Sequence, residues 1–437
     1  MRATDIIEKK KTGNVHTYEE LKFLVDGYLN GTVEEAQMSA WLMAVCFRGL
    51  NFDETVYLTD IFIKSGDVLD FSNIEGHIAD KHSTGGVGDK VTLVLIPILA
   101  SLGVKCAKLS GRGLGMTGGT IDKFESIPNF NCMLSEEDFI SKINTVGAAI
   151  SAQTPNLVPA DGKIYALRDV TSTVDNMSLI AASVVSKKIA SGADVIVLDV
   201  KYGSGAFIKT LDEAKILADL MVKIGQKLGR RINAVISSME QPLGRAVGNS
   251  LEVIEAIDFL KGKLSYDLYE ITLEIAAKTL ILSEVAKTFE EAKKLVDASI
   301  LQGKALQKFK EIIASQGGNP EVVDNYKLLP MGEYFIQVKA NKDMGYVKTL
   351  DALKVAHACK LLGAGRDKKS DKIDFGAGCT IGKKKGNKVK KGDTLITLYY
   401  NQNVLKSRIE EAANYAYGAY TFSEEKVQKE RIVANMN

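Results

Sequence analysis

The first 66 residues show a helical pattern of hydrophobic and polar positions. Apolar side chains recur at intervals of three and four residues, as Leu21, Leu24 and Tyr28 do, which puts them on one face of a helix. Three segments open with a capping residue followed by Glu three positions later, the pattern of a capping box: Thr17 with Glu20, Thr32 with Glu35, and Asn51 with Glu54. A glycine follows each segment, at Gly31, Gly49 and Gly66. The pattern predicts a small all-helical domain over residues 1–66.

From about residue 76 the pattern changes to short apolar runs, each followed by a glycine-containing turn and a longer helical stretch. The clearest runs, which are typical of buried strands, are Val104 to Leu109, Asp194 to Val200 and Ile232 to Ser237. This alternation predicts an α/β domain with a mostly parallel central sheet, whose strand ends open onto a ligand crevice. We assign residues 67–162 and 193–335 to it. Residues 163–192 have helical periodicity but no strand, and we expect them to dock back onto the helical domain.

The last hundred residues, 336–437, show a third pattern of residue types. They contain the glycine-rich stretch Gly376 to Gly378 and a strand-like run from Thr394 to Tyr400. We expect a compact C-terminal α+β unit, so the predicted fold class is α/β plus an all-α lobe. The run Lys383 to Lys385 is interpreted as a solvated turn rather than a polyanion site, because no aromatic residues are interleaved with the lysines.

Charge and composition exclude several classes of function. The chain has 437 residues, with 56 Lys and Arg against 54 Asp and Glu, so a net charge of +2 provides no broad basic field for nucleic acid. The longest apolar run, Val91 to Val104, is interrupted by polar residues and is shorter than the ~20 residues of a membrane span. The start lacks the apolar stretch of a signal peptide, and five cysteines without a CxxC pair suggest neither disulfides nor a zinc site. We expect a cytoplasmic protein with neither a nucleic-acid nor a membrane partner.

Two glycine-rich segments carry the candidate chemistry. Residues 81–89 read KHSTGGVGD and residues 110–120 read SGRGLGMTGGT, each after a short apolar stretch and before a helical pattern. Glycines there let backbone N–H groups approach an oxyanion, and hydroxyls with one Lys complete a phosphate cradle. Neither segment matches GxxxxGK[ST] or a spaced GxGxxG, so nucleoside triphosphates and dinucleotides are disfavoured and no organic cofactor is expected.

The second segment, extended to SGRGLGMTGGTIDKFE, resembles the signature of the thymidine and pyrimidine-nucleoside phosphorylases. The similarity also covers KHSTGGVGD, YALRDVT at 165–171, SKKIASGAD at 186–194 and DVKYGSGAF at 199–207. The resemblance implies phosphorolysis of a pyrimidine (deoxy)nucleoside by inorganic phosphate, giving free base and (deoxy)ribose 1-phosphate. It also implies a homodimer whose subunit has helical, α/β and C-terminal α+β parts.

The resemblance further implies which residues bind the substrates. Phosphate would be held by Lys81, His82, Ser83, Thr92, Lys108, Leu109, Ser110 and Thr120. The base would be held by Tyr165, Arg168, Ser183, Lys187 and Met116, of which Arg168, Ser183 and Lys187 are the candidate catalytic residues. Negative charge gathers on the departing base, so fixed cations would stabilise the transition state. If residues 183–187 are helical, Ser183 and Lys187 lie on the same face of the helix.

The alternative interpretation of Arg168 and Lys187 is that each forms a surface ion pair with Asp169 or Asp194. Because base and phosphate residues fall in different lobes, lobe closure is expected before reaction.

A monovalent cation, such as K⁺, is also implied by the resemblance. The matching positions are Gly88, Lys90, Leu243, Ala246 and Glu255. Position 90 is Lys here. If the site uses only the carbonyl of residue 90, this is harmless, but if it needs a hydroxyl oxygen, the ammonium could replace the ion.

Met116 is the main departure, because the family motif usually has His there. A thioether cannot donate the proton that an imidazole could deliver to the base. Met116 is then a lost catalytic group, a sign of a reshaped base pocket, or a tolerated change. Two other functions stay open: glycosyl transfer of the anthranilate phosphoribosyltransferase type, and a ligand-binding homologue impaired by Met116. The choice between ribose and 2-deoxyribose is also open.

Overall fold

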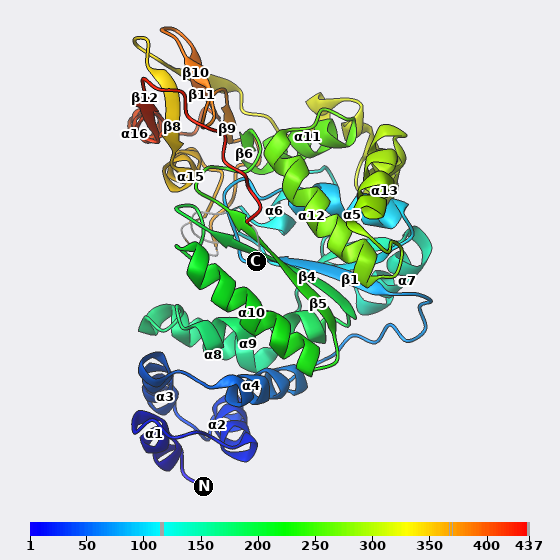
Figure 1. The fold of residues 1–437 in the computed structure, drawn as a ribbon, viewed down its shortest axis with the longest axis vertical. Helices are drawn as coiled ribbons and strands as arrows, with labels where there is room; N and C mark the ends of the chain where they lie inside the picture. Colours follow the sequence, from blue (N-terminus) through cyan, green and yellow to red (C-terminus); the bar gives the residue numbers. More distant parts are fainter. Residues whose placement is uncertain (114–117, 367, 369, 435–437) are drawn as a thin grey trace. The chain divides into compact units, whose positions relative to one another are not determined.

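The computed structural model describes residues 1–113, 118–366, 368 and 370–434. The chain forms two compact units, whose course can be followed in Figure 1. Unit 1 consists of Met1–His82, Gln153–Val197 and Lys215–Ala234. Unit 2 consists of Ser83–Ala152, Leu198–Ala214 and Val235–Asn437.

Unit 1 is mainly helical. Its N-terminal helices are α1 (Ala3–Lys11), α2 (Tyr18–Asn30), α3 (Glu35–Arg48) and α4 (Phe52–Lys64), and from later in the chain come α8 (Pro159–Thr171), α9 (Met177–Ala190) and most of α10 (Leu211–Lys227). α8 contacts α2 and α3, and α4 packs along α9 (Figure 1). The helices of residues 163–192 therefore share one core with the N-terminal helices.

Two of the three predicted helix starts are confirmed. Thr17 and Asn51 cap α2 and α4, because each side chain accepts the backbone N–H three residues on. The third prediction is wrong: α3 begins after Glu34, whose backbone N–H donates to the side chain three residues on (3.0 Å). The Thr32 hydroxyl instead donates to Asn30 Oδ1 (2.8 Å), a bond within the preceding turn.

A parallel five-stranded sheet forms the centre of the α/β domain. Its strand order is β3-β2-β1-β4-β5, and β2 pairs with β3 in parallel, with Cys106 opposite Ala148. The strands are β1 (Ile78–Ser83), β2 (Lys105–Ser110), β3 (Ala148–Ala152), β4 (Val195–Tyr202) and β5 (Arg231–Ser238). The three strands predicted from apolar runs are thus confirmed as β2, β4 and β5. Almost all of β4 is buried, as both faces of such a sheet are covered.

The long apolar run becomes the buried helix α5 (Val91–Ser101), which packs against α12 and α14 of unit 2. The other helices of the α/β part of this unit are α6 (Thr120–Glu125), α7 (Glu136–Val146), α11 (Asn249–Leu260), α12 (Tyr266–Leu282), α13 (Phe289–Leu301) and α14 (Lys304–Ser315), followed by the short turns η1 (Pro320–Val323) and η2 (Tyr326–Leu328). Among the described residues, no helix combines the length and apolarity that crossing a membrane requires.

The C-terminal part of unit 2 is a small α+β structure, as predicted. It contains α15 (Ala352–Leu361), α16 (Lys406–Gly418), β7 (Tyr334–Lys339), β8 (Gly345–Leu350), β9 (Gly378–Ile381), β10 (Lys388–Val389), β11 (Thr394–Tyr400) and β12 (Tyr420–Ser423). One sheet has the order β10-β8-β12 and the other β6-β9-β11-β7. The strand β6 (Ala246–Val247) comes from the α/β part and pairs with β9, with Val247 opposite Cys379.

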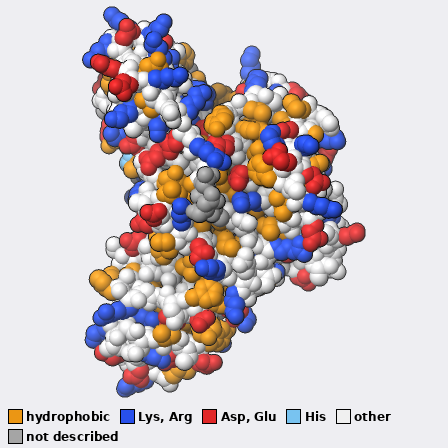
Figure 2. Space-filling model, viewed as in Figure 1, with side chains coloured by type: hydrophobic (Ala, Val, Ile, Leu, Met, Phe, Trp, Pro, Cys, Tyr) orange, Lys and Arg blue, Asp and Glu red, His pale blue; other side chains and the backbone are white. Residues whose placement is uncertain are grey.

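The lysine run is not the solvated turn that we predicted. Lys383 pairs with Asp393 (2.7 Å), Lys385 pairs with Glu430 (2.8 Å), and Lys384 is buried. The prediction failed because their acidic partners lie elsewhere in the sequence. On the face drawn in Figure 2, Lys and Arg side chains are interspersed with Asp and Glu, and no single basic field is visible.

Candidate active site

The candidate base-binding residues lie on α8 and α9 of unit 1. Tyr165 and Arg168 come from α8, and Ser183 and Lys187 come from α9 one turn apart. Lys187 Nζ donates to Ser183 Oγ (3.1 Å) and lies 5.6 Å from the centroid of the Tyr165 ring, and Arg168 Cζ lies 5.8 Å from the same centroid. The structure therefore brings these four side chains into one cluster.

Asp161 is a functional candidate beside these residues that the sequence reasoning missed. Its Oδ2 lies 2.6 Å from Lys187 Nζ and accepts a hydrogen bond from Ser183 Oγ (2.9 Å). Its side chain is fully buried, and its Oδ1 has no hydrogen-bond partner within the described part of the chain. A signal was available: Asp161, Tyr165 and Arg168 are spaced i, i+4 and i+7, which is one face of a helix.

Arg168 is only 1% exposed and holds the chain between α8 and α9. It donates to the backbone oxygens of Thr173 (3.1 Å), Val174 (2.7 Å) and Leu179 (3.3 Å). Burial lowers the pKa of the guanidinium, against the opposing charge of Asp161. A guanidinium carries five N–H donors, so these three bonds do not use its whole capacity.

Among the described residues, the surface ion pairs of Arg168 and Lys187 with Asp169 or Asp194, which we weighed as the alternative, are not formed. Lys187 pairs with Asp161, while Asp194 contacts His77 Nδ1 (2.5 Å) and accepts the N–H of Ile78 (2.7 Å). The buried Arg168 is likewise no surface residue.

In the first glycine-rich segment, the side chain of an acidic residue, Asp89, links the two ends of the loop. Ser83 Oγ donates to Asp89 Oδ2 (2.6 Å) and accepts the N–H of Gly85 (3.2 Å). The loop is fixed to the end of β4, because Thr84 Oγ1 accepts the N–H of Lys201 (2.9 Å). Gly85 has φ +94°, and a side chain there would meet no atom within 4 Å, so this part of the loop has open space in front of its backbone.

In the second glycine-rich segment, the carboxylate of Asp122 binds backbone N–H groups of the loop. Its Oδ2 accepts the N–H groups of Gly113 (2.6 Å) and Gly119 (3.2 Å). Arg366 pairs with Asp122 Oδ1 (2.7 Å) and donates to Gly113 O (3.1 Å). Sequence reasoning missed both Asp122 and Arg366. Met116 lies outside the described residues.

The other phosphate candidates are distributed over both units. Lys81 and His82 belong to unit 1. In unit 2, the candidates after Ser83 are Thr92 in the first turn of α5, Lys108, Leu109 and Ser110 at the end of β2, and Thr120 at the start of α6. Lys108 is buried, and its Nζ donates to Leu109 O (3.4 Å). Strand ends and helix starts are where a phosphate site is expected in an α/β fold.

The five candidate cation-site residues converge within unit 2. Lys90 Nζ donates to the backbone oxygens of Gly88 (2.7 Å) and Leu243 (2.6 Å) and lies 3.1 Å from Glu255 Oε2. Glu255 Oε2 also accepts the N–H of Ala246 (2.8 Å). The ammonium of Lys90 is thus at the centre of the set.

Three family descriptions match this chain. The helical bundle domain of a glycosyl transferase family matches residues 4–66, the a/b domain of a glycosyl transferase family matches residues 75–306, and a pyrimidine nucleoside phosphorylase C-terminal domain matches residues 346–423. The fold and the site thus define a glycosyl transferase built from a helical bundle and an α/β domain, with a C-terminal addition.

Proteins similar in sequence to this chain identify its family more narrowly. The pyrimidine-nucleoside phosphorylase of Geobacillus stearothermophilus is 51% identical over 402 residues, which cover 92% of this chain and 93% of that protein. The pyrimidine-nucleoside phosphorylase of Staphylococcus haemolyticus has the same identity and the same coverage. The chain belongs to the pyrimidine-nucleoside phosphorylase family. A crystal structure of anthranilate phosphoribosyltransferase from Thermus thermophilus has a TM-score of 0.58 at 17% identity, covering 71% of this chain and 99% of that chain, and so shares the fold.

Proposed function

We propose that this protein catalyses the phosphorolysis of pyrimidine nucleosides to free base and (deoxy)ribose 1-phosphate. A phosphate oxygen forms a bond to C1′ of the sugar while the glycosidic C–N bond breaks. The electron pair of that bond moves onto the base, which then takes up a proton. The reaction therefore needs a group that stabilises negative charge on the departing pyrimidine.

The cluster on α8 and α9 is the observation that carries this proposal. An ammonium has three N–H donors, and Asp161 and Ser183 take two of those of Lys187, so one is left for a carbonyl oxygen of the base. Arg168 supplies a second cation, and its Cζ is 5.8 Å from the centroid of the Tyr165 ring. Tyr165 is 41% exposed and offers a flat apolar surface to a planar base. Two fixed cations beside an aromatic ring suit a pyrimidine that leaves as an anion.

For phosphate we propose the two glycine-rich loops together with the lysines and hydroxyls named above. Asp89 and Asp122 each satisfy donors of their own loop, which preorganises the backbone before phosphate binds. Ammonium groups together with hydroxyl and N–H donors bind phosphate by hydrogen bonds, and an oxygen lone pair remains for attack on C1′.

The test is base release from uridine, thymidine, deoxyuridine, cytidine and a purine nucleoside, with and without inorganic phosphate. We expect release of pyrimidines only, strictly dependent on phosphate, with one sugar 1-phosphate per base. Comparing uridine with deoxyuridine determines the sugar preference. Nucleoside binding without turnover would instead favour a ligand-binding homologue, and pyrophosphate release from a phosphoribosyl donor with anthranilate would favour the phosphoribosyltransferase alternative.

We also propose a homodimer acting in the cytoplasm, which the family resemblance supports. Light scattering after size exclusion would give twice the chain mass, and a monomer mass would contradict it.

A further inference from the structure

The Lys90 ammonium lies in a cage of oxygens at the start of α5. Lys90 has no exposed surface, and its three closest acceptors are Gly88 O, Leu243 O and Glu255 Oε2. Three acceptors match the three N–H donors of an ammonium. Gly88 has φ +72°, and a Cβ there would lie 2.7 Å from Leu243 O and 3.2 Å from Ala246 O. Only glycine allows these backbone oxygens to converge so closely.

The cage stabilises a positive charge. Burying the charge of Lys90 is costly, and the carboxylate of Glu255, 3.1 Å from its Nζ, together with the two backbone oxygens offsets that cost. A monovalent cation would use the same oxygens, because K⁺ and an ammonium group have similar size and charge. Since the Lys90 ammonium fills this position, the residues present do not fit an additional bound ion.

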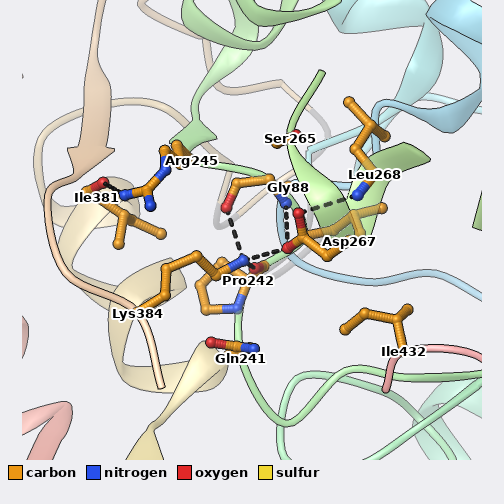
Figure 3. Close-up of polar contacts among 12 residues, drawn as sticks. Gly88, Gln241, Pro242, Arg245, Ser265, Asp267, Leu268, Ile381, Lys384 and Ile432 are labelled. Atoms are coloured by element: carbon orange, nitrogen blue, oxygen red, sulfur yellow. Dashed lines mark hydrogen bonds and ion pairs between the residues drawn. The ribbon is translucent and has the colours of Figure 1, made fainter. Parts of the chain in front are cut away.

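A second lysine, Lys384, binds the same backbone segment. Figure 3 shows Lys384 reaching Asp267 and the backbone at Pro242. Lys384 Nζ donates to Pro242 O (2.8 Å) and Gly244 O (2.9 Å), and Asp267 Oδ2 accepts the N–H of Gly244 (3.0 Å). Together with Lys90, the two ammoniums therefore take three successive backbone oxygens, those of residues 242, 243 and 244.

The segment is tied to the C-terminal part by further bonds. Arg245 donates to Ile381 O (3.0 Å), at the end of β9 (Figure 3), and to Gly382 O (3.1 Å), the next residue along the chain. Residues 246–247 form β6, which pairs with β9. The backbone oxygens that the cation would bind thus belong to a segment fixed within unit 2.

We propose that the Lys90 ammonium is a built-in substitute for the monovalent cation at this site, so that the folded protein is stable without K⁺ and binds none there. The expected consequence of shortening this side chain is a new requirement: the vacated oxygens should recruit a cation from solution.

The test uses thermal unfolding of the full chain in potassium, sodium and choline chloride at equal ionic strength. The wild type is expected to have the same Tm in potassium and choline. Lys90→Thr should have a lower Tm in choline that potassium restores. For Lys90→Ala, measured in addition in methylammonium chloride, the Tm should be restored by potassium and by methylammonium, whose ammonium group can enter the cavity. The matched control is Lys384→Met, which removes the neighbouring ammonium but keeps Lys90. It should lower the Tm equally in all three salts.

Binding of radioactive Rb⁺ by equilibrium dialysis is the second readout, and it needs only the wild type if the variants do not fold. We expect no stoichiometric binding by the wild type and about one ion per chain for Lys90→Thr. A wild type that binds Rb⁺ stoichiometrically, or whose Tm rises in potassium alone, would overturn the proposal. So would a folded Lys90→Thr that responds to no cation. Neither readout depends on catalysis, so this inference and the proposed reaction can fail separately.

Discussion

Replacing Asp161 by Asn should slow base release without unfolding the protein. Asp161 Oδ2 is the shared acceptor of Lys187 Nζ (2.6 Å) and Ser183 Oγ (2.9 Å). Asn keeps the size and one acceptor oxygen but removes the charge that fixes the ammonium. Asp161 has no proposed contact with the substrate, so we interpret it as a positioning residue that acts through Lys187.

The magnitude follows from the kind of bond that is lost. A hydrogen bond to a charged group contributes about 1.5–3 kcal/mol, and about 1.4 kcal/mol is a factor of ten in rate. The side chain of Lys187 is 25% exposed, so water partly replaces the lost carboxylate, and the lower end of this range applies. We expect kcat to fall roughly tenfold in Asp161→Asn. Lys187→Met removes the cation itself and should cost roughly 10²-fold or more, as for loss of one preorganised stabiliser.

The assay is a double-mutant cycle with uridine and saturating phosphate, measuring kcat and KM separately for the wild type, both single variants and the double variant. If Asp161 acts only by positioning Lys187, the double variant should be no slower than Lys187→Met. The decrease should appear in kcat, because the ammonium matters most when the base carries negative charge. Thermal unfolding of each variant is the control for structural damage.

Two results would refute this reasoning. If the effects of the two substitutions on kcat multiply, Asp161 has a role independent of Lys187. An unchanged kcat in Asp161→Asn would mean that the ammonium needs no carboxylate for its position.

Three further predictions concern other parts of the chain. Lys81→Ala should weaken phosphate binding and lower turnover together in a folded protein, and unchanged phosphate kinetics would remove Lys81 from the cradle. At position 116, an electron-withdrawing 5-substituent should help the wild type more than Met116→His, because without a donor more charge stays on the leaving base; equal ratios of 5-fluorouridine to uridine rates in the two proteins would contradict this. His16 accepts a hydrogen bond from Trp41 Nε1 (3.1 Å), and burial together with the nearby Lys10 lowers the pKa of His16 from 6.5 to about 4. The unfolded chain binds the proton more readily, so stability should decrease as pH falls through that window, by about 2 kcal/mol between pH 7 and 5. Urea unfolding should show this dependence reduced in His16→Gln and retained in His357→Gln.

The elements that sequence predicted correctly are those set by local rules. The runs that became β2, β4 and β5 are apolar because strands of a covered parallel sheet are buried on both faces. Thr17 and Asn51 cap helices through a backbone group only three residues away. Thr32 failed because another short-range bond, to Asn30, competes for the same hydroxyl.

What sequence could not predict are pairings between distant residues. Lys384 meets a partner 117 positions away, and Ser183 meets Asp161 across 22 positions. A run of three lysines indicates solvation on composition alone, and no periodicity encodes which acid lies opposite. The sequence could have predicted Asp161 as a site residue, because its spacing places it on the same helix face as Tyr165 and Arg168. That spacing does not predict that Lys187 is its partner.

Replacing a bound ion by the ammonium of a lysine changes how the free energy of unfolding depends on the salt in the solution. A bound ion stabilises the folded state by RT ln(1 + [L]/Kd), so its contribution disappears as the ion is diluted. The Lys90 ammonium is part of the chain, on the residue that precedes α5, so its supply does not depend on the medium. Fixing a lysine side chain costs about 2 kcal/mol of rotamer entropy, and burial of the charge adds to this cost. The carboxylate of Glu255 and two converging backbone oxygens offset both. Because Lys384 binds the oxygens on either side of Leu243, the segment that carries them should keep its shape in any salt as long as both lysines are present.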